Sequence, residues 1–294
     1  MKVIQSFAEF DEGSPYLKDD GSSKYLNFYS FFLSFITLKK YCGGVTMYCN
    51  NKAYNSFIKY IPYSETILFE NKNTFRFWSS YKIDVMGLMK EKFVNVDTDV
   101  FIFDDVFKEF KTDNYDVVIQ NRFLAEQNPD ISSFVSHNIE FIKKNNIIDP
   151  NIYDGCSLNC GVVGMKLEIR DEYLELSNKI KFGYESNQIS CKATTNEPYV
   201  VSSSLEELPL YFLILKKNLN ILEILPQDMI NSIGIHATAN KMKYTHLWNN
   251  TKFNTKYIKA IKVKILEEFP GAKEYIDKYE KDVMGKTNIL NEIL

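Results

Sequence analysis

The chain has 294 residues, of which 45% are hydrophobic and 25% are charged, and its formal net charge is -3. These values are ordinary for a soluble globular protein and exclude collagen, coiled coil and extensive disorder. Nucleic acid is disfavoured as the main partner, because proteins that bind it usually carry a basic patch that neutralises phosphates. An anionic small ligand stays open if a metal or a local lysine cluster neutralises it.

The apolar runs and the cysteines favour a cytoplasmic protein. The run at 3–7 is too short for a secretory signal, and the longest later runs, 31–38 and 208–215, fall far short of the roughly 20 residues of a membrane span. Cysteine occurs five times, and an odd number favours reduced thiols over a disulfide framework. We therefore expect a soluble cytoplasmic protein.

Short apolar runs alternate with helical patterns over the first hundred residues. The apolar runs predict strands at 3–7, 45–49, 66–69 and 93–96. The helical patterns predict helices at 24–40, 52–61 and 76–90. Alternation at this spacing is typical of a parallel sheet with crossover helices, in which ligands bind beyond the carboxyl ends of the strands.

The second half is more mixed. Further strands are expected at 116–120, 160–165, 221–225 and 233–236. Helices are expected at 132–144, at 168–181 and from Ser203 or Ser204 to about 217, with a polar loop at 183–198 and a helical tail from about 255. The pattern predicts an α/β fold: a Rossmann-like mixed sheet flanked by helices in a single globular domain with a helical carboxyl-terminal tail.

The most chemically informative segment is Asp97-Thr98-Asp99, which directly follows the strand predicted at 93–96. Two carboxylates one residue apart would enter the crevice at the end of the sheet. Hard divalent cations such as Mg²⁺ and Mn²⁺ prefer such oxygen ligands, and Mg²⁺ shares its coordination shell with substrate phosphates. The alternative interpretation is a pair of solvated carboxylates in a turn.

With this motif in place, the chain resembles glycosyltransferases of the GT-A fold, especially bacterial enzymes of surface-polysaccharide synthesis and the glycogenin-like group. The resemblance covers most of residues 1–245. The segments that carry it are 2–7, 77–82, Asp97-Thr98-Asp99, Asn159-Cys160-Gly161-Val162-Val163-Gly164 and Gly234-Ile235-His236. The resemblance implies a GT-A domain at 1–250, with a nucleotide-binding half at 1–125 and an acceptor-side half at 126–250, and a helical extension at 251–294.

The same resemblance implies a metal centre. Asp97-Thr98-Asp99 would hold Mn²⁺ or Mg²⁺ and the donor diphosphate, with Asp99 chelating the ion directly and Asp97 touching the ion or the ribose. His236 would be a late metal ligand. A structural histidine after a short strand is the alternative for His236.

Other residues receive donor-side roles by resemblance. Asn159 and Gly161 would line the sugar or acceptor pocket, and Lys82 would face the nucleotide. Lys241, or Lys243 beside it, would hold the departing diphosphate. The chain departs from the family here, because Ala239 and Lys241-Met242-Lys243 stand where the glycogenin-like group has Gly and Lys-Pro-Trp. Solvated lysines and a buried strand are the plain alternatives.

Glu206 and Glu207 are expected in the first turn of a helix. A carboxylate there resembles the general base of inverting enzymes, which deprotonates the acceptor hydroxyl. Acidic residues in a first turn also simply complement the helix dipole. We expect Glu206 to be the better candidate.

The implied activity is transfer of a hexose from a nucleotide diphosphate donor, by resemblance UDP, to an acceptor hydroxyl in polysaccharide or glycoconjugate synthesis. The acceptor would be a glycan or a lipid-linked glycan. A haloacid-dehalogenase-like phosphatase with Asp97 as nucleophile and Asp99 as acid/base is one alternative. A non-catalytic GT-A-like binding protein is another.

The tail offers one partner hypothesis. Residues 254–269 place isoleucines on one face of a helix with lysines around them. Such a helix would lie on an anionic membrane surface beside a lipid-linked acceptor, at the inner face of the membrane. Packing of the helix on its own domain is the alternative.

Overall fold

The computed structural model describes residues 1–9, 23–70, 78–190, 197–226, 243–247 and 254–283. The chain divides into two compact units that interleave along the sequence. The first unit comprises Met1–Lys2, Phe77–Asn95 and Phe107–Gly234. The second comprises Val3–Arg76, Val96–Val106 and Ile235–Leu294.

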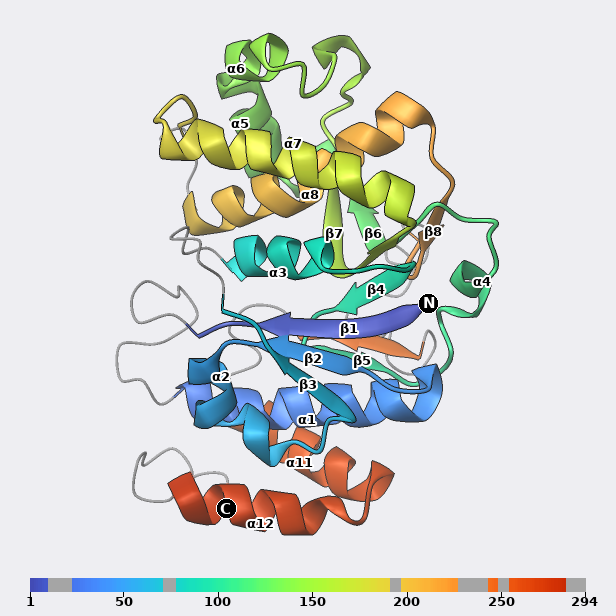
Figure 1. The fold of residues 1–294 in the computed structure, drawn as a ribbon, viewed down its shortest axis with the longest axis vertical. Coiled ribbons are helices and arrows are strands. Elements are labelled where there is room, and N and C mark those ends of the chain that lie inside the picture. The colour runs from blue at the N-terminus through green and yellow to red at the C-terminus, as the bar shows by residue number, and fades with distance from the viewer. Residues whose placement is uncertain (10–22, 71–77, 191–196, 227–242, 248–253, 284–294) are drawn as a thin grey trace. The chain divides into compact units, whose positions relative to one another are not determined.

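The second unit is built on three parallel strands in the order β3-β2-β1. The strands are β1 (Lys2–Phe7), β2 (Thr46–Cys49) and β3 (Glu65–Leu68). Helix α1 (Ser23–Cys42) connects β1 to β2, and α2 (Asn51–Ser56) with the 3₁₀ turn η1 (Ile58–Tyr60) connects β2 to β3. This is the strand–helix alternation that the sequence predicts (Figure 1).

Helix α1 is the central helix of this unit. Every side chain from 26 to 38 is buried, which explains why the helix is apolar all round and rich in phenylalanine. Lys39 and Lys40 are exposed in its last turn, where cations complement the helix dipole. The buried polar exceptions on α1 are Asn27, Ser30, Ser34 and Thr37.

A second, two-stranded sheet lies in the same unit. It pairs β5 (Val100–Ile102) antiparallel to β9 (Tyr244–His246), and α1 packs against β5. Helix α11 (Thr255–Glu268) packs against α1, and α12 (Ala272–Val283) packs against η1 and α11. Tyr279 of α12 stacks on Phe28 of α1, with ring centroids 3.8 Å apart.

The first unit contains strands in the order β4-β7-β6-β8. They are β4 (Phe93–Val96), β7 (Ser157–Met165), β6 (Val117–Phe123) and β8 (Ile221–Glu223). Strand β6 is antiparallel to β7 and parallel to β8, so the pairing is mixed. The longer helices are α3 (Trp78–Gly87), α5 (Pro129–His137), α7 (Leu167–Glu185) and α8 (Glu197–Lys217). Helix α8 packs on β7, α3 and α7.

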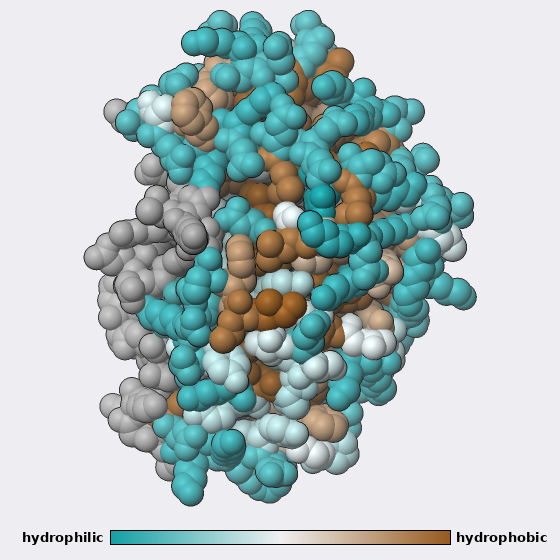
Figure 2. Space-filling view, in the orientation of Figure 1, coloured by the Kyte–Doolittle hydropathy of each residue, from teal (hydrophilic) through white to brown (hydrophobic). Residues whose placement is uncertain are grey.

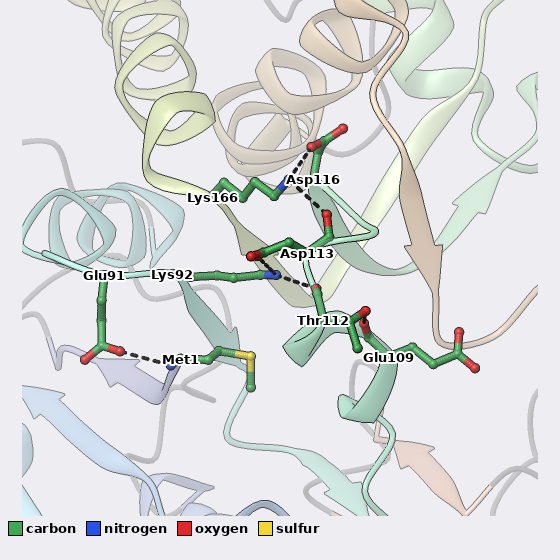
Figure 3. A network of polar contacts seen from close by, with 8 residues as sticks. All are labelled: Met1, Glu91, Lys92, Glu109, Thr112, Asp113, Asp116 and Lys166. Carbon is green, nitrogen blue, oxygen red and sulfur yellow. Dashed lines mark hydrogen bonds and ion pairs between the residues drawn. The ribbon is translucent and has the colours of Figure 1, made fainter.

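Ion pairs and hydrogen bonds join loops at the ends of the strands of the first unit (Figure 3). Lys92, just before β4, contacts Asp113 after the short helix α4 (Lys108–Lys111). Lys166, just after β7, bonds to Asp116 at 2.9 Å, and Asp116 also accepts the backbone N–H of Asn220. These contacts connect the ends of β4, β6, β7 and β8.

The predicted α/β class, a mixed sheet flanked by helices, is confirmed. The start of α8 is corrected: the helix begins at Glu197 and not at Ser203 or Ser204. Glu206 therefore lies in the third turn and not in the first. Pro198, the second residue of the helix, is the sequence signal for the earlier start, because proline is favoured in a first helical turn.

Smaller differences concern breaks in the predicted helices. The helix predicted at 132–144 is two helices, α5 and α6 (Ile139–Lys144), separated at Asn138. Helix α7 continues to Glu185, so Gly183 is a buried helical residue and not part of a loop. Strand β7 begins at Ser157 and so includes Asn159.

The amphipathic tail packs on its own unit. Ile258, Ile261 and Ile265 of α11 are buried, so the apolar face that the sequence offers to a membrane is occupied. No helix within the described residues is long and apolar enough to span a membrane. On the face of the molecule in Figure 2, hydrophilic side chains predominate over α6 and α7.

Candidate functional site

The acidic motif forms a tight turn in the second unit, between the end of β4 and the start of β5. The N–H of Val100 donates to the carbonyl oxygen of Asp97 at 3.1 Å, which closes a four-residue turn. Asp97 and Thr98 are half-buried and Asp99 is buried. The two carboxylates are thus held on a compact piece of backbone.

Strand β9 brings a histidine to this turn. The antiparallel register places His246 opposite Val100, and the N–H of Leu247 donates to the carbonyl oxygen of Asp99 at 3.0 Å. The His246 Nε2 atom lies 3.3 Å from the Asp99 Oδ1 atom. One ligand atom from each of Asp97, Asp99 and His246 lies within 4.8 Å of the other two.

The two carboxylates also act on Tyr244, which lies in β9. Burial raises the pKa of the Tyr244 hydroxyl well above its ordinary value, and the charges of Asp97 and Asp99 raise it further. The side chains of Asp99 and His246 are 11% and 12% exposed, so solvent screens them only weakly. Two like charges in such a place are stabilised by a cation.

The donor set suits a divalent cation. Two carboxylate oxygens and an imidazole nitrogen are ligands that Mn²⁺ accepts, and carboxylates with substrate phosphates are the usual shell of Mg²⁺. Asp97 and Asp99 are the residues that the sequence predicts for this role, and the structure brings them together with His246.

His246 is the site residue that the sequence reasoning missed. The short run Tyr244-Thr245-His246 has the composition of a strand, since tyrosine and threonine favour extended backbone. That signal predicts a strand but not its partner. The pairing with Val100 joins residues about 150 positions apart, which no local pattern reveals.

His236 and Lys241 lie outside the described residues, so their predicted roles stay predictions. Lys243 is described: it is exposed, has a positive φ of 56° and immediately precedes β9. Its carbonyl oxygen accepts the N–H of Phe103 at 2.7 Å, which extends the β5–β9 pairing by one bond.

Two other predicted residues meet in the first unit. The Lys82 Nζ atom of α3 lies 2.5 Å from the Glu206 Oε1 atom of α8, and both residues are buried. Lys82 also donates to the carbonyl oxygen of Cys160 in β7 at 2.5 Å. The solvated-charge interpretation of Lys82 and the dipole interpretation of Glu206 are therefore wrong, while Glu207 is half-buried beside them on α8.

The predicted Asn-x-Gly element lies in the middle of β7. The Asn159 side-chain oxygen accepts the N–H of Gly161 at 2.9 Å, and Gly161 is buried. Gly164 allows a close approach, but to protein and not to a ligand. A Cβ atom there would lie 2.5 Å from the carbonyl oxygen of Phe93 in β4.

Comparison with solved structures finds glycosyltransferases among the similar chains. Mouse xyloside xylosyltransferase 1 is 9% identical with a TM-score of 0.38, and the match covers 86% of this chain and 93% of that one. An active-site mutant of LgtC is 8% identical with a TM-score of 0.37, covering 69% of each chain. The bifunctional glycosyltransferase WbbM is 10% identical with a TM-score of 0.34.

The WbbM match covers 60% of this chain and only 34% of WbbM, so this chain spans about a third of that protein. At such TM-scores the likeness assigns no residue role and no chemistry. No curated protein matches the sequence.

A family-level sequence match extends over residues 1–279, which is nearly the whole chain. The family is described as a family of unknown function, DUF6734. A match of this extent includes the acidic turn, β9, the whole of the first unit and the second unit as far as residue 279. The chain therefore belongs to the DUF6734 family.

Proposed function

We propose that this chain transfers a sugar from a nucleotide diphosphate donor, a UDP-sugar, to an acceptor hydroxyl with the help of a divalent cation. The observation that carries the proposal is the convergence of Asp97, Asp99 and His246 at one point of the second unit. The acceptor would be a glycan or a lipid-linked glycan of a cell-surface polysaccharide or glycoconjugate.

The chemistry explains why such a cluster suits such a donor. Breaking the bond between sugar and diphosphate leaves negative charge on the phosphate oxygens, and bound Mn²⁺ or Mg²⁺ would stabilise that charge. A chain with a net charge of -3 offers no general attraction to a diphosphate. Asp97 and Asp99 would hold the ion together with His246, and His236 stays a predicted further ligand.

The donor-side and catalytic residues remain part of this proposal. As the resemblance implies, Asn159 and Gly161 would line the pocket of the donor sugar or the acceptor, and Lys241 would hold the departing diphosphate. Glu206 is bound to Lys82 in the structure, so it would act on an acceptor only after leaving that ion pair. Glu207, one residue further along α8, is the alternative base.

Membrane contact through the tail would use the outward face of α11. Tyr257 and Val263 are 48% and 57% exposed on this helix, and Lys256 and Lys259 are exposed beside them. This combination suits an anionic lipid surface. Co-sedimentation with phosphatidylglycerol vesicles, but not with phosphatidylcholine vesicles, would support it, and equal recovery with both would contradict it.

The activity is tested by incubating the full chain with Mn²⁺ and a panel of nucleotide sugars and measuring release of the nucleoside diphosphate. Asp99→Asn should abolish the release, because it removes a charged ligand at nearly constant volume. Asp104→Asn is the matched control, since Asp104 is an exposed carboxylate five residues away outside the cluster.

The alternatives predict different products. A phosphatase that uses Asp97 as nucleophile would release orthophosphate from phosphate monoesters and leave nucleotide sugars intact. A binding protein would show stabilisation by UDP with Mn²⁺ but no release. Stabilisation by UDP that needs no metal and survives Asp99→Asn would overturn the proposed site.

A further inference from the structure

We infer that Gln5 and Ser34 are positioning residues that set the shape of the Asp97–Val100 turn and so bring the two carboxylates together. The inference rests on the proposed cation site. Gln5 lies in β1 and Ser34 in α1, and each side chain is fully buried. Both belong to the buried polar residues of the second unit.

Gln5 holds the first carbonyl of the turn. Its Nε2 atom donates to the carbonyl oxygen of Asp97 at 3.4 Å. The same oxygen accepts the N–H of Val100, which closes the turn. The backbone that carries the Asp97 carboxylate is thus fixed from β1 as well as from within the turn.

Ser34 holds the last carbonyl of the turn. Its Oγ atom donates to the carbonyl oxygen of Val100 at 2.6 Å and accepts the Gln5 Nε2 atom at 2.8 Å. Thr37, one turn further along α1, accepts the N–H of Ile102 at 3.2 Å. Helix α1 therefore bonds to the edge of β5 that faces away from β9.

A third residue orients the glutamine. The Tyr63 hydroxyl donates to the Gln5 Oε1 atom at 2.9 Å, which fixes which end of the amide points to the turn. Each polar atom of the Gln5 side chain therefore has a partner. Buried networks of this kind are rigid when every member is satisfied, and they cost stability when one is missing.

We expect the loss of these hydrogen bonds to lower the affinity for the cation more than the stability of the fold. The carbonyls of Asp97 and Val100 bracket the two carboxylates, so movement of either carbonyl changes the distance between Asp97 and Asp99. Residues that orient metal ligands typically change metal affinity by about 10–100-fold when they are substituted. A purely structural pair of hydrogen bonds would change stability and leave the affinity of the folded protein unaltered.

The test compares two identical substitutions on one helix. Ser34→Ala removes the bonds to the turn, whereas Ser30→Ala removes a bond from a buried serine to the carbonyl of Asn27 within α1. Gln5→Met is the stronger variant. Affinity for Mn²⁺ alone is measured on the full chain by electron paramagnetic resonance of free Mn²⁺, with thermal unfolding of each variant in parallel.

Ser34→Ala should weaken Mn²⁺ binding by about 10-fold or more, and Ser30→Ala should leave it unchanged. If the wild type binds Mn²⁺, and Ser34→Ala and folded Gln5→Met bind it with the same affinity as the wild type, the inference is overturned. The cation site would then remain in place. Equal losses in Ser34→Ala and Ser30→Ala would also overturn the inference. Failure of the wild type to bind Mn²⁺ would overturn the cation site itself, and the inference with it.

Discussion

Each unit contains one group of charged residues around a buried carboxylate, and the two groups surround that carboxylate in different ways. In the first unit Glu206 faces a lysine, and the pair is internally neutral. In the second unit Asp97 and Asp99 face each other and His246. The first group joins a carboxylate to a lysine, whereas the second brings together two carboxylates and an imidazole, which are ligand types for a divalent cation.

The difference separates stability from binding. A buried ion pair is costly to break because the remaining charge stays in a medium of low polarity. A cluster of like charges is relieved by an added cation, since repulsion between carboxylates becomes attraction to a common ion. We therefore expect substitutions in the first group to change the free energy of unfolding, and those in the second to change its dependence on Mn²⁺.

The largest expected effect follows from breaking the ion pair. Glu206→Ala leaves the Lys82 ammonium buried between α3, α8 and the carbonyl of Cys160. We expect it to lower the free energy of unfolding by about 3–5 kcal/mol, measured by urea denaturation.

The matched double variant sharpens this prediction. Lys82→Met combined with Glu206→Leu removes both charges at similar volume, and it should recover most of the lost stability. A Glu206→Ala protein as stable as the wild type would mean that the pair is solvated in solution, against the burial seen here.

The second effect concerns the acidic cluster. Mn²⁺ at 100 times its dissociation constant should stabilise the wild type by about 2.7 kcal/mol, and this gain should vanish in Asp99→Asn. Without Mn²⁺ the variant should differ less from the wild type, because the substitution removes both the repulsion from Asp97 and the contact between Asp99 and His246. If Mn²⁺ stabilised the wild type and Asp99→Asn equally, the acidic cluster would not be the site where Mn²⁺ binds, and the difference proposed between the two groups would be wrong.

A third substitution tests whether a loss of stability in the first unit leaves Mn²⁺ affinity unchanged. Gly164→Ala places a Cβ atom 2.5 Å from the carbonyl oxygen of Phe93 and 2.9 Å from side-chain atoms of Val94 and Val118. Such overpacking should cost about 1–3 kcal/mol of stability in thermal unfolding. Mn²⁺ affinity should not change, because the contacts lie in the first unit. A loss of affinity would instead mean that strain in β4, which ends directly before Asp97, changes the acidic turn.

The smallest effect is a pH dependence in the first unit. Burial would raise the pKa of Asp116, but hydrogen bonds from Lys166 and from the N–H of Asn220 hold it below its usual value. Its stabilising contribution is present above the unfolded pKa of about 3.9 and is lost as the pH falls through the lower folded value. Asp116→Asn should therefore reduce the loss of stability on acidification below about pH 4. The free energy of unfolding is measured as a function of pH, and the same loss below about pH 4 in both proteins would contradict this prediction.

The sequence reveals those parts of the fold that depend on local patterns. The strands β1 to β4 follow from short apolar runs, and the Asp-x-Asp motif follows from its place directly after such a run. The sequence predicts the start of α8 too late, because three serines and two glutamates resemble a capped and charged first turn.

The parts that sequence reasoning missed depend on contacts between distant residues. The serines of α8 are buried in the middle of a helix, which depends on the packing of α3 and α7 against it. The partnership of Glu206 with Lys82 joins residues more than 120 positions apart. The roles of Gln5 and His246 depend likewise on which strand lies beside the acidic turn. The hydrophobic periodicity of one segment does not predict which other segment packs against it.

The central claim is that Asp97, Asp99 and His246 hold one divalent cation. The most direct measurement is a crystal structure of the full chain grown with Mn²⁺ and UDP, with anomalous diffraction recorded at the manganese edge. We predict a single strong peak within coordination distance of the Asp99 carboxylate and His246 Nε2, with the diphosphate on its open side. A peak remote from both aspartates, or UDP bound elsewhere without manganese, would contradict the account.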